Sequence, residues 1–240
     1  MSSVIIPARY ASVRFPGKVL VKIGGIPLIE RVVAQCLKTK ADNVYVVTDD
    51  ERVSEALRHT GVPVIMSPPE IATGTDRVAF AAKGLTDAVI INAQGDEPFI
   101  SPALIDTLIE QLSADASLNM ITACCEFKAG EDIGNPANVK VVLDSNGYAL
   151  YFSRLPIPCD RDMKAHPVRY KHIGIYGFKR DFLLKYAEMP ATPLESSEML
   201  EQLRALENGE RIKVIKTAYK PISIDTADDL AIAEEYLKSL

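Results

Sequence analysis

The sequence lacks the glycine-rich signatures of two large classes of nucleotide-binding enzyme. Its 240 residues contain no G-x-G-x-x-G motif and no G-x-x-x-x-G-K-[ST] motif, which argues against a nicotinamide-dependent oxidoreductase and against a P-loop kinase. No run of residues approaches the roughly 20 apolar residues that a membrane-spanning helix requires. The chain does not open with the basic segment and apolar stretch of a signal peptide. We therefore expect a cytoplasmic protein without a membrane span.

Cysteine and positive charge are also sparse. The cysteines have no spacing typical of a metal site, and we expect reduced thiols at Cys36, Cys124, Cys125 and Cys159. The 32 acidic residues outnumber the 27 Lys and Arg residues, which gives a net charge of −5. This balance argues against nucleic acid as a partner. An anionic small molecule must therefore be attracted by a local cluster of positive charge.

The hydrophobic pattern predicts an α/β domain. Hydrophobic residues make up 48% of the chain, which is enough for a substantial core. In the first half, short apolar strands alternate with amphipathic helices. The expected strands are 4–7, 44–48, 62–66, 88–93 and 120–127, and the expected helices are 27–37, 50–59, 74–82 and 102–112. Repeated βα units of this length predict a three-layer, Rossmann-like fold with a mixed, mostly parallel sheet.

The pattern changes after residue 130. Segments 139–144 and 148–153 flank Asn146-Gly147, a pair that favours a tight hairpin turn. The segments expected to follow are a strand at 172–178, helices at 180–188 and 194–207, a strand at 212–216 and a last helix from 227. We expect residues 1–240 to form one domain, in which 130–190 are an inserted subregion that contains the hairpin.

A cluster of positive charge follows the first strand. Pro7 ends that strand, and Arg9, Arg14 and Lys18 then lie in one irregular segment. Guanidinium groups, an ammonium and free backbone N–H groups in such a loop suit a polyphosphate. By spacing alone, a solvated basic loop explains the cluster equally well.

Acidic residues follow two other predicted strands. Gln94-Gly95-Asp96 ends the apolar run at 88–91, and ligands of open α/β sheets bind beyond the carboxyl ends of the strands. A carboxylate at that place can hold Mg²⁺ against phosphate oxygens, although an ordinary acidic turn has the same composition. Asp225 precedes the last helix, where by itself it indicates only a favourable helix N-terminus.

Other polar residues carry weaker signals by themselves. The segment Thr73–Arg77 precedes a predicted helix, so its hydroxyls and N–H groups can cap that helix, bind a ligand, or do both. Arg154 follows a strand and fits either a surface charge or a carboxylate-binding group. His172 and Tyr176 share one face of their predicted strand, where a histidine is more often structural than functional.

Several separated segments, taken together and in order, resemble the 3-deoxy-manno-octulosonate cytidylyltransferases. This family, also called CMP-Kdo synthetases, belongs to the sugar nucleotidyltransferases. The matching segments read R-Y-A-S-x-R-F-P-G-K, G-T-D-R, Q-G-D-E-P, V-K-V-V-x-D with G-x-A-L-Y-F-S-R, H-I-G-I-Y-G, L-E-Q-L-R and I-D-T-A-D-D. The resemblance extends from residue 4 to about residue 237, and chance agreement at all of these segments in order is hard to obtain.

The resemblance implies both a fold and an activity. The fold is that of the nucleotide-diphospho-sugar transferases. The activity is the Mg²⁺-dependent reaction of CTP with 3-deoxy-D-manno-octulosonate (Kdo), which gives CMP-Kdo and pyrophosphate for lipopolysaccharide biosynthesis. Members of the family are homodimers, so a homodimer is implied as well.

The resemblance also assigns roles to individual residues. Asp96 and Asp225 would hold the metal, and with Arg9, Arg14 and Lys18 they would form the catalytic set. The implied nucleotide contacts are Pro7, Ala8, Arg9, Arg14, Lys18, Thr73, Gly74, Arg77 and Gln94. The implied sugar contacts are Gln94, Arg154, His172, Tyr176, Glu201 and Gln202.

Two departures from the family pattern lie near the expected sugar side. Ser196-Ser197 stands where many members have a histidine and an apolar residue, and Cys159 stands where an aromatic residue is frequent. These changes leave the acid sugar open between Kdo, an amino-substituted Kdo and sialic acid. A catalytically silent nucleotide-binding protein is the alternative from another class, and the intact carboxylate pair argues against it.

Overall fold

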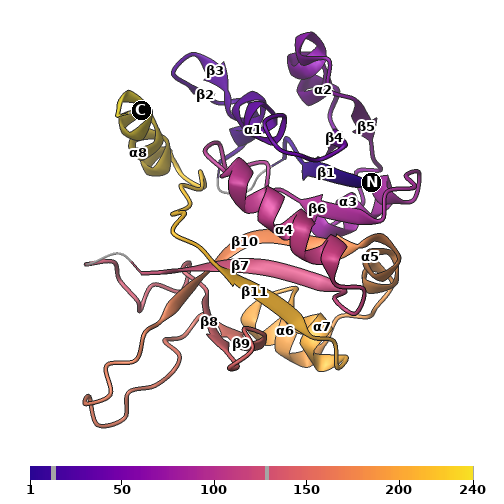
Figure 1. Ribbon diagram of the computed structural model, residues 1–240. Helices are drawn as coiled ribbons and strands as arrows, with labels where there is room; N and C mark the ends of the chain where they lie inside the picture. Colours follow the sequence, from indigo (N-terminus) through magenta and orange to yellow (C-terminus); the bar gives the residue numbers. More distant parts are fainter. Residues whose placement is uncertain (12–14, 128–129, 240) are drawn as a thin grey trace.

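The computed structural model describes residues 1–11, 15–127 and 130–239. Within these ranges a nine-stranded sheet forms the centre of the molecule (Figure 1). Its main path has the order β11-β7-β10-β6-β1-β4-β5, with β8 beside β10 and β9 beside β8. The strands are β1 (Ser2–Pro7), β4 (Asn43–Thr48), β5 (Val64–Met66), β6 (Val89–Asn92), β7 (Met120–Glu126), β8 (Lys140–Leu143), β9 (Ala149–Ser153), β10 (Tyr170–Lys179) and β11 (Ile212–Lys216). A separate hairpin pairs β2 (Lys22–Ile23) with β3 (Ile26–Pro27).

One long strand runs against its neighbours. β10 pairs antiparallel with both β6 and β7, whereas β1 is parallel to β4 and β6, and β11 is parallel to β7. The other strands of the main path therefore point the same way, and their carboxyl ends meet at one edge of the sheet. Because the chain enters β10 at this edge, the first residues of β10 lie beside those ends. The predicted mixed, mostly parallel sheet is confirmed.

Helices cover both faces of the sheet (Figure 1). They are α1 (Leu28–Cys36), α2 (Glu51–Leu57), α3 (Gly74–Ala82), α4 (Pro102–Ala114), α5 (Arg180–Ala187), α6 (Pro193–Glu198), α7 (Leu203–Glu207) and α8 (Ala227–Lys238), with short 3₁₀ turns η1 (Lys18–Leu20) and η2 (Arg58–Thr60). Side chains of α1, α2 and α4 pack into one core, and those of α3, α5 and α7 into another. No helix in the described part of the chain is both long enough and apolar enough to cross a membrane.

The central strands are apolar on both faces because each face meets a layer of helices. In β1, Val4 and Ile6 belong to the core under α1 and α4, and Ile5 belongs to the core under α3. All three side chains are fully buried. A near-continuous apolar run, rather than an alternating one, is what a strand covered on both faces requires.

The prediction of one continuous helix at 194–207 is wrong, because the chain forms two helices there. The first, α6, has a capping box made by Thr192 and Glu195. It ends at Met199, which adopts the left-handed conformation with φ 52° and ψ 49°, and α7 begins only at Leu203. A non-glycine residue in this region is strained and is held by surrounding contacts. The backbone N–H of Met199 donates to Glu195, and the distant Arg154 donates to the carbonyl of Met199 at 3.1 Å, so no local glycine or proline marks the break.

Gly177 in β10 provides a test of this packing. A Cβ atom there would lie 2.7 Å from side-chain atoms of Ile121 and Leu112 and 2.9 Å from Ile91. Overpacking a tight core costs about 1–3 kcal/mol, so Gly177→Ala should lower the free energy of unfolding by that amount in urea titrations. Gly84→Ala is the control, since the nearest atom to a Cβ there is 3.8 Å away. Equal stability of the two variants would contradict the prediction.

Candidate active site

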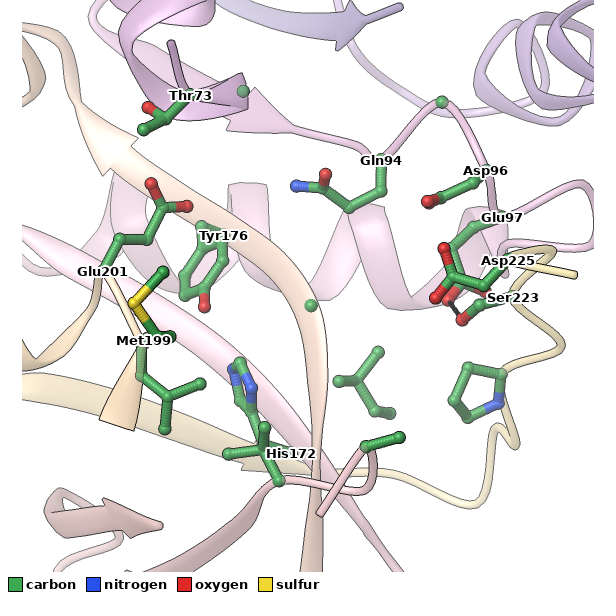
Figure 2. Close-up of a pocket in the computed structure, with 18 of the residues that line it drawn as sticks. Thr73, Gln94, Asp96, Glu97, His172, Tyr176, Met199, Glu201, Ser223 and Asp225 are labelled. Carbon is green, nitrogen blue, oxygen red and sulfur yellow. Dashed lines mark hydrogen bonds between the residues drawn. The ribbon is translucent and has the colours of Figure 1, made fainter. Parts of the chain in front are cut away.

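A pocket of about 1360 Å³ opens at the carboxyl edge of the sheet. Its walls come from the ends of β1 and β6, the start of α3, the first half of β10, the turn between α6 and α7, and the segment before α8. Figure 2 shows the two sides of this space, with Asp96 and Asp225 on one side and Glu201 and Tyr176 on the other. A space of this size is large enough for two substrates bound together.

Every site residue that the sequence predicts, and that the structure describes, lines this pocket. These residues are Pro7, Ala8, Arg9, Lys18, Thr73, Gly74, Arg77, Gln94, Asp96, Arg154, His172, Tyr176, Glu201, Gln202 and Asp225. Arg14 lies outside the described residues. The fold therefore collects side chains that are far apart in the sequence, although lining a pocket does not by itself assign their roles.

Lys18 joins the two predicted metal-binding carboxylates. Its Nζ atom lies 2.7 Å from Oδ2 of Asp96 and 2.8 Å from Oδ1 of Asp225. Burial by itself lowers the pKa of this ammonium, but the two adjacent carboxylates outweigh burial, and the net effect raises the pKa. Lys18 therefore carries a positive charge and stabilises the two negative charges beside it. Its predicted contact with the triphosphate stays a prediction.

The loop after β6 places Asp96 close to the end of β1. Gly95 allows this approach, because a Cβ atom at Gly95 would lie only 2.6 Å from the carbonyl oxygen of Pro7. The carbonyl oxygen of Asp96 accepts a hydrogen bond from the N–H of Ile224 at 3.0 Å. The residue after Ile224 is Asp225, so this backbone contact brings the second carboxylate to the first.

The donor set of this pair fits Mg²⁺. The side chains of Asp96 and Asp225 are 28% and 37% exposed, so both open to the pocket while they contact Lys18. Mg²⁺ is usually bound by one or two carboxylates together with phosphate oxygens and water. The described residues contain no group of three or more acidic, histidine or cysteine side chains suited to a metal. Water or substrate oxygens would complete the coordination of a metal ion held by these two carboxylates.

The start of α3 forms another wall. Thr73 is the N-cap, and its hydroxyl oxygen accepts a hydrogen bond from the N–H of Asp76 at 3.0 Å. The predicted capping is confirmed. The guanidinium of Arg77 is buried and donates hydrogen bonds to Asp49 at 2.9 Å, to the hydroxyl of Ser67 and to a backbone carbonyl. Arg77 therefore fixes the loop before Thr73, and its direct contact with a nucleotide stays a prediction.

His172 and Tyr176 face the pocket from β10, on either side of an irregularity in the strand. The pairing of β10 with β7 shifts between Ile173 and Tyr176, and the hydroxyl of Thr122 fills the gap by donating to the carbonyl of Ile175 at 2.7 Å. The same hydroxyl lies 2.9 Å from Nε2 of His172. The single hydrogen of the Thr122 hydroxyl is donated to the carbonyl of Ile175. Nε2–H of His172 therefore donates to the hydroxyl oxygen of Thr122, and Nδ1 of His172 is left as an acceptor. The two rings, with centroids 5.4 Å apart, lie on one face as predicted.

Burial keeps His172 neutral. His172 is partly buried on the pocket wall, and the protein packed around its ring lowers its pKa from 6.5 to about 3. A neutral imidazole can accept a hydrogen bond from a hydroxyl group or donate one to it, without bringing a charge into the pocket.

Three predicted sugar contacts lie near the break between α6 and α7. Glu201 accepts a hydrogen bond from the hydroxyl of Thr75 at 2.7 Å, and burial raises the pKa of its carboxyl. Among the described residues, Nε2 of Gln202 is buried and has no hydrogen-bond partner. The guanidinium of Arg154 donates to backbone carbonyls of Glu198, Pro136 and Met199 at 2.7, 2.9 and 3.1 Å. Arg154 thus holds this turn in place, and its contact with a sugar carboxylate stays a prediction.

The sequence reasoning missed Glu97. This residue directly follows Asp96 and lines the pocket, yet its carboxyl is almost completely buried and its pKa is raised to about 7, mainly by burial and also by the charge of Asp96. The motif Q-G-D-E-P contains Glu97, but a local pattern cannot show which of two adjacent carboxylates turns toward the core.

Comparison with known proteins identifies the class and then the family. Residues 3–212 match a family model described as cytidylyltransferase, so the chain is a cytidylyltransferase by descent. Proteins named 3-deoxy-manno-octulosonate cytidylyltransferase from Trichlorobacter lovleyi and Geobacter metallireducens are 45% and 48% identical to it, over 98% and 94% of this chain and 97% and 93% of theirs. The chain belongs to this family, and the resemblance inferred from its sequence is confirmed.

Solved structures agree. The structure of a CMP:2-keto-3-deoxy-manno-octonic acid synthetase complexed with CTP matches with a TM-score of 0.94 and 36% identity, over 100% of this chain and 99% of that one. A cytidylyltransferase from Leptospira borgpetersenii matches with a TM-score of 0.66 at 17% identity, over 100% of this chain and 87% of that one, and this likeness concerns the fold alone.

The buried imidazole of His172 predicts a loss of stability in acid. The unfolded chain takes up a proton at a pKa of 6.5 and the folded chain only near 3, so this contribution is fully present above pH 6.5 and is lost as the pH falls toward 3. At about pH 4.5 the loss amounts to roughly 2–3 kcal/mol. In urea titrations at neutral pH and at this lower pH, His172→Gln should shrink the difference between the two free energies of unfolding by that amount. His166→Gln, at an exposed position, should leave the difference unchanged. The same acid loss in His172→Gln as in the unchanged protein would refute this origin.

Proposed function

We propose that this protein is a cytoplasmic, Mg²⁺-dependent enzyme that transfers the CMP group of CTP to Kdo and releases pyrophosphate. The product, CMP-Kdo, is the activated sugar for lipopolysaccharide assembly. The observation that carries the proposal is the placement of Lys18 between Asp96 and Asp225 at one end of a pocket whose other end bears His172 and Tyr176. Its support from relatives is their family name and the CTP bound in the similar solved structure.

In the proposed reaction the hydroxyl on C2 of Kdo attacks the α-phosphorus of CTP. A C2–O–P bond forms, the bond between the α- and β-phosphoryl groups breaks, and the hydroxyl proton passes to solvent. Asp96 and Asp225 would hold Mg²⁺, which when bound supplies charge neutralisation and lowers the pKa of a nearby hydroxyl. No side chain needs to act as a nucleophile, because transfer of this kind depends on positioning and on stabilisation of charge.

The positively charged residues act on the triphosphate. Once phosphate oxygens enter the pocket, Lys18 can exchange a carboxylate for a phosphate and stabilise the charge that builds up on the leaving pyrophosphate. Arg9, two residues after β1, lines the same pocket and adds a guanidinium that can contact two oxygens at once.

The opposite wall recognises the acid sugar. The neutral imidazole of His172, the amide of Gln202 and the carboxyl of Glu201 offer donors and acceptors to several hydroxyl groups. Ser196 also lines the pocket, at one of the two positions where this chain departs from the family pattern. An amino-substituted Kdo or sialic acid therefore stays as the alternative acceptor.

Asp225→Asn tests the proposal. With CTP and Kdo, the unchanged enzyme should release pyrophosphate and form CMP-Kdo, as seen by mass spectrometry, and EDTA should stop the reaction. Asp225→Asn should lower the turnover by about 100-fold or more, the scale of losing one group that stabilises transition-state charge. Asp228→Asn, three residues on and outside the pocket lining, should keep its activity.

The same assay decides between acceptors. Faster release with an amino-substituted Kdo or with sialic acid would change the sugar in the proposal. If no pyrophosphate is released with any of the three sugars, the alternative of a catalytically silent nucleotide-binding protein is supported.

We also propose that the enzyme is a homodimer that associates through the region 130–190. Large apolar side chains of this stretch are exposed at Leu150, Leu155, Met163 and Val168, and an interface would bury them. In size-exclusion chromatography with light scattering, the protein should have the mass of a dimer, and the double variant Leu155→Asp with Val168→Asp should have the mass of a monomer. Leu37→Asp changes an exposed leucine outside this region and should stay dimeric. A monomeric unchanged protein would contradict the proposal.

A further inference from the structure

Asp225 is carried by a segment that has no regular structure. Residues 217–226 lead from β11 to α8 without forming a helix or a strand. Fixing the backbone of each such residue costs about 1–2 kcal/mol of conformational entropy. The position of Asp225 opposite Asp96 must therefore be set by contacts between this segment and the rest of the protein.

Glu97 makes two of those contacts. Its carboxylate accepts a hydrogen bond from the hydroxyl of Ser223 and another, at 3.3 Å, from the hydroxyl of Tyr219. Figure 2 shows Glu97 beside Ser223 and Asp225, with the bond to Ser223 drawn as a dashed line. Glu97 is only 6% exposed, so both hydrogen bonds are shielded from competing water.

The backbone makes a contact between the same two segments. The N–H of Ile224 donates to the carbonyl of Asp96 at 3.0 Å, and the side chain of Ile224 is fully buried. The segment before Asp225 is thus joined to Asp96 and Glu97 by two side-chain hydrogen bonds, from Tyr219 and Ser223, and by one backbone hydrogen bond, from Ile224. The next side chain, Asp225, then meets Lys18 at 2.8 Å.

Joining two segments through a buried carboxylate costs desolvation free energy. Desolvation of a carboxylate disfavours its burial, and apolar side chains of similar volume often stabilise a fold as well or better. An apolar contact, however, lacks direction, whereas two hydrogen bonds to one carboxylate define the place and the orientation of the segment that supplies them. Glu97 is therefore better explained by the geometry that it imposes than by stability.

We propose that Glu97 is a positioning residue, which sets the Asp225 carboxylate against Asp96 and so determines the affinity of the pair for a divalent cation. Glu97 itself touches neither metal nor substrate. This inference rests on the proposed function, in which Asp96 and Asp225 hold the metal.

The test compares two variants of Glu97 in the full-length protein. Glu97→Ala removes both hydrogen bonds to the segment. In Glu97→Gln the amide oxygen can still accept from the Ser223 hydroxyl, and the amide N–H can donate to the oxygen of the Tyr219 hydroxyl. The glutamine has no charge, so it cannot replace a metal-binding carboxylate. Mn²⁺ binding, followed by electron paramagnetic resonance without nucleotide or sugar, is the first measurement. The Mg²⁺ dependence of kcat is the second.

Glu97→Ala should weaken Mn²⁺ binding by about 10- to 100-fold, the usual effect of removing a group that orients a metal ligand. The Mg²⁺ concentration for half-maximal kcat should rise in parallel. Glu97→Gln should stay within about threefold of the unchanged protein, since it loses at most part of a hydrogen bond. Asp87→Ala is the matched control, because Asp87 is also a buried carboxylate, bonded to Asn43, but lies before β6 at the far end of the strand.

Two single variants keep the test valid if Glu97→Ala does not fold. Ser223→Ala and Tyr219→Phe each remove one hydrogen bond and leave the carboxylate in place. Each should weaken Mn²⁺ binding by a smaller factor, and adding Ser223→Ala to Glu97→Ala should have no further effect, because both changes break the same contact.

The proposal is overturned if Glu97→Ala, or in its place both single variants, bind Mn²⁺ as the unchanged protein does. It is also overturned if Glu97→Gln is as weak as Glu97→Ala, since Glu97 would then act through its charge. An unchanged protein that binds Mn²⁺ with this dependence but releases no pyrophosphate from CTP and an acid sugar would refute the proposed function, not the positioning role.

Discussion

A single ammonium group between two carboxylates joins three distant parts of the chain. Lys18 lies in η1, Asp96 follows β6 and Asp225 precedes α8, and the three charged groups meet within hydrogen-bond distance. Two carboxylates side by side repel each other, and a cation between them offsets that repulsion. The positive charge of Lys18 therefore allows the N-terminal loop, the central loop and the C-terminal segment to close around one pocket. Each other element of the site is placed relative to this contact.

The sheet makes that contact geometrically available. Strands that point the same way bring the loops after β1 and β6 to a common edge, which is where ligands bind in open α/β sheets. The reversed strand β10 adds a second set of side chains at this edge, because its first residues lie beside the ends of its neighbours. His172 and Tyr176, four residues apart on β10, share one face of the strand and line the same space. One edge thus carries the Lys18–Asp96–Asp225 cluster at one end and the ring side chains of β10 at the other.

Much of this arrangement could be predicted from the sequence, and the failures share a cause. Strands such as β1 are recognisable because they are apolar on both faces. Asp96 is recognisable because it is an acidic residue in the loop that follows such a strand, β6. The break at Met199 was not predictable, since its left-handed backbone is held by side chains such as Arg154 from elsewhere in the chain. Nor could the sequence show that the guanidinium of Arg77 is occupied by Asp49, or that Glu97 turns inward. Local patterns indicate which residue types are present, whereas tertiary contacts decide which groups those residues meet.

The buried amide of Gln202 has a consequence for selectivity. In the part of the chain that the structure describes, Nε2 of Gln202 is buried without a hydrogen-bond acceptor. A buried donor without a partner costs about 1–3 kcal/mol. In the proposed function, an acceptor sugar that presents an oxygen to this amide would remove the penalty, whereas one with a methylene there would leave it in place. Sites built in this way discriminate mainly by rejecting the wrong molecule, and they do so more sharply than an apolar cavity that senses only size. The amide of Gln202 would then distinguish between acceptors by the cost of leaving its hydrogen bond unmade.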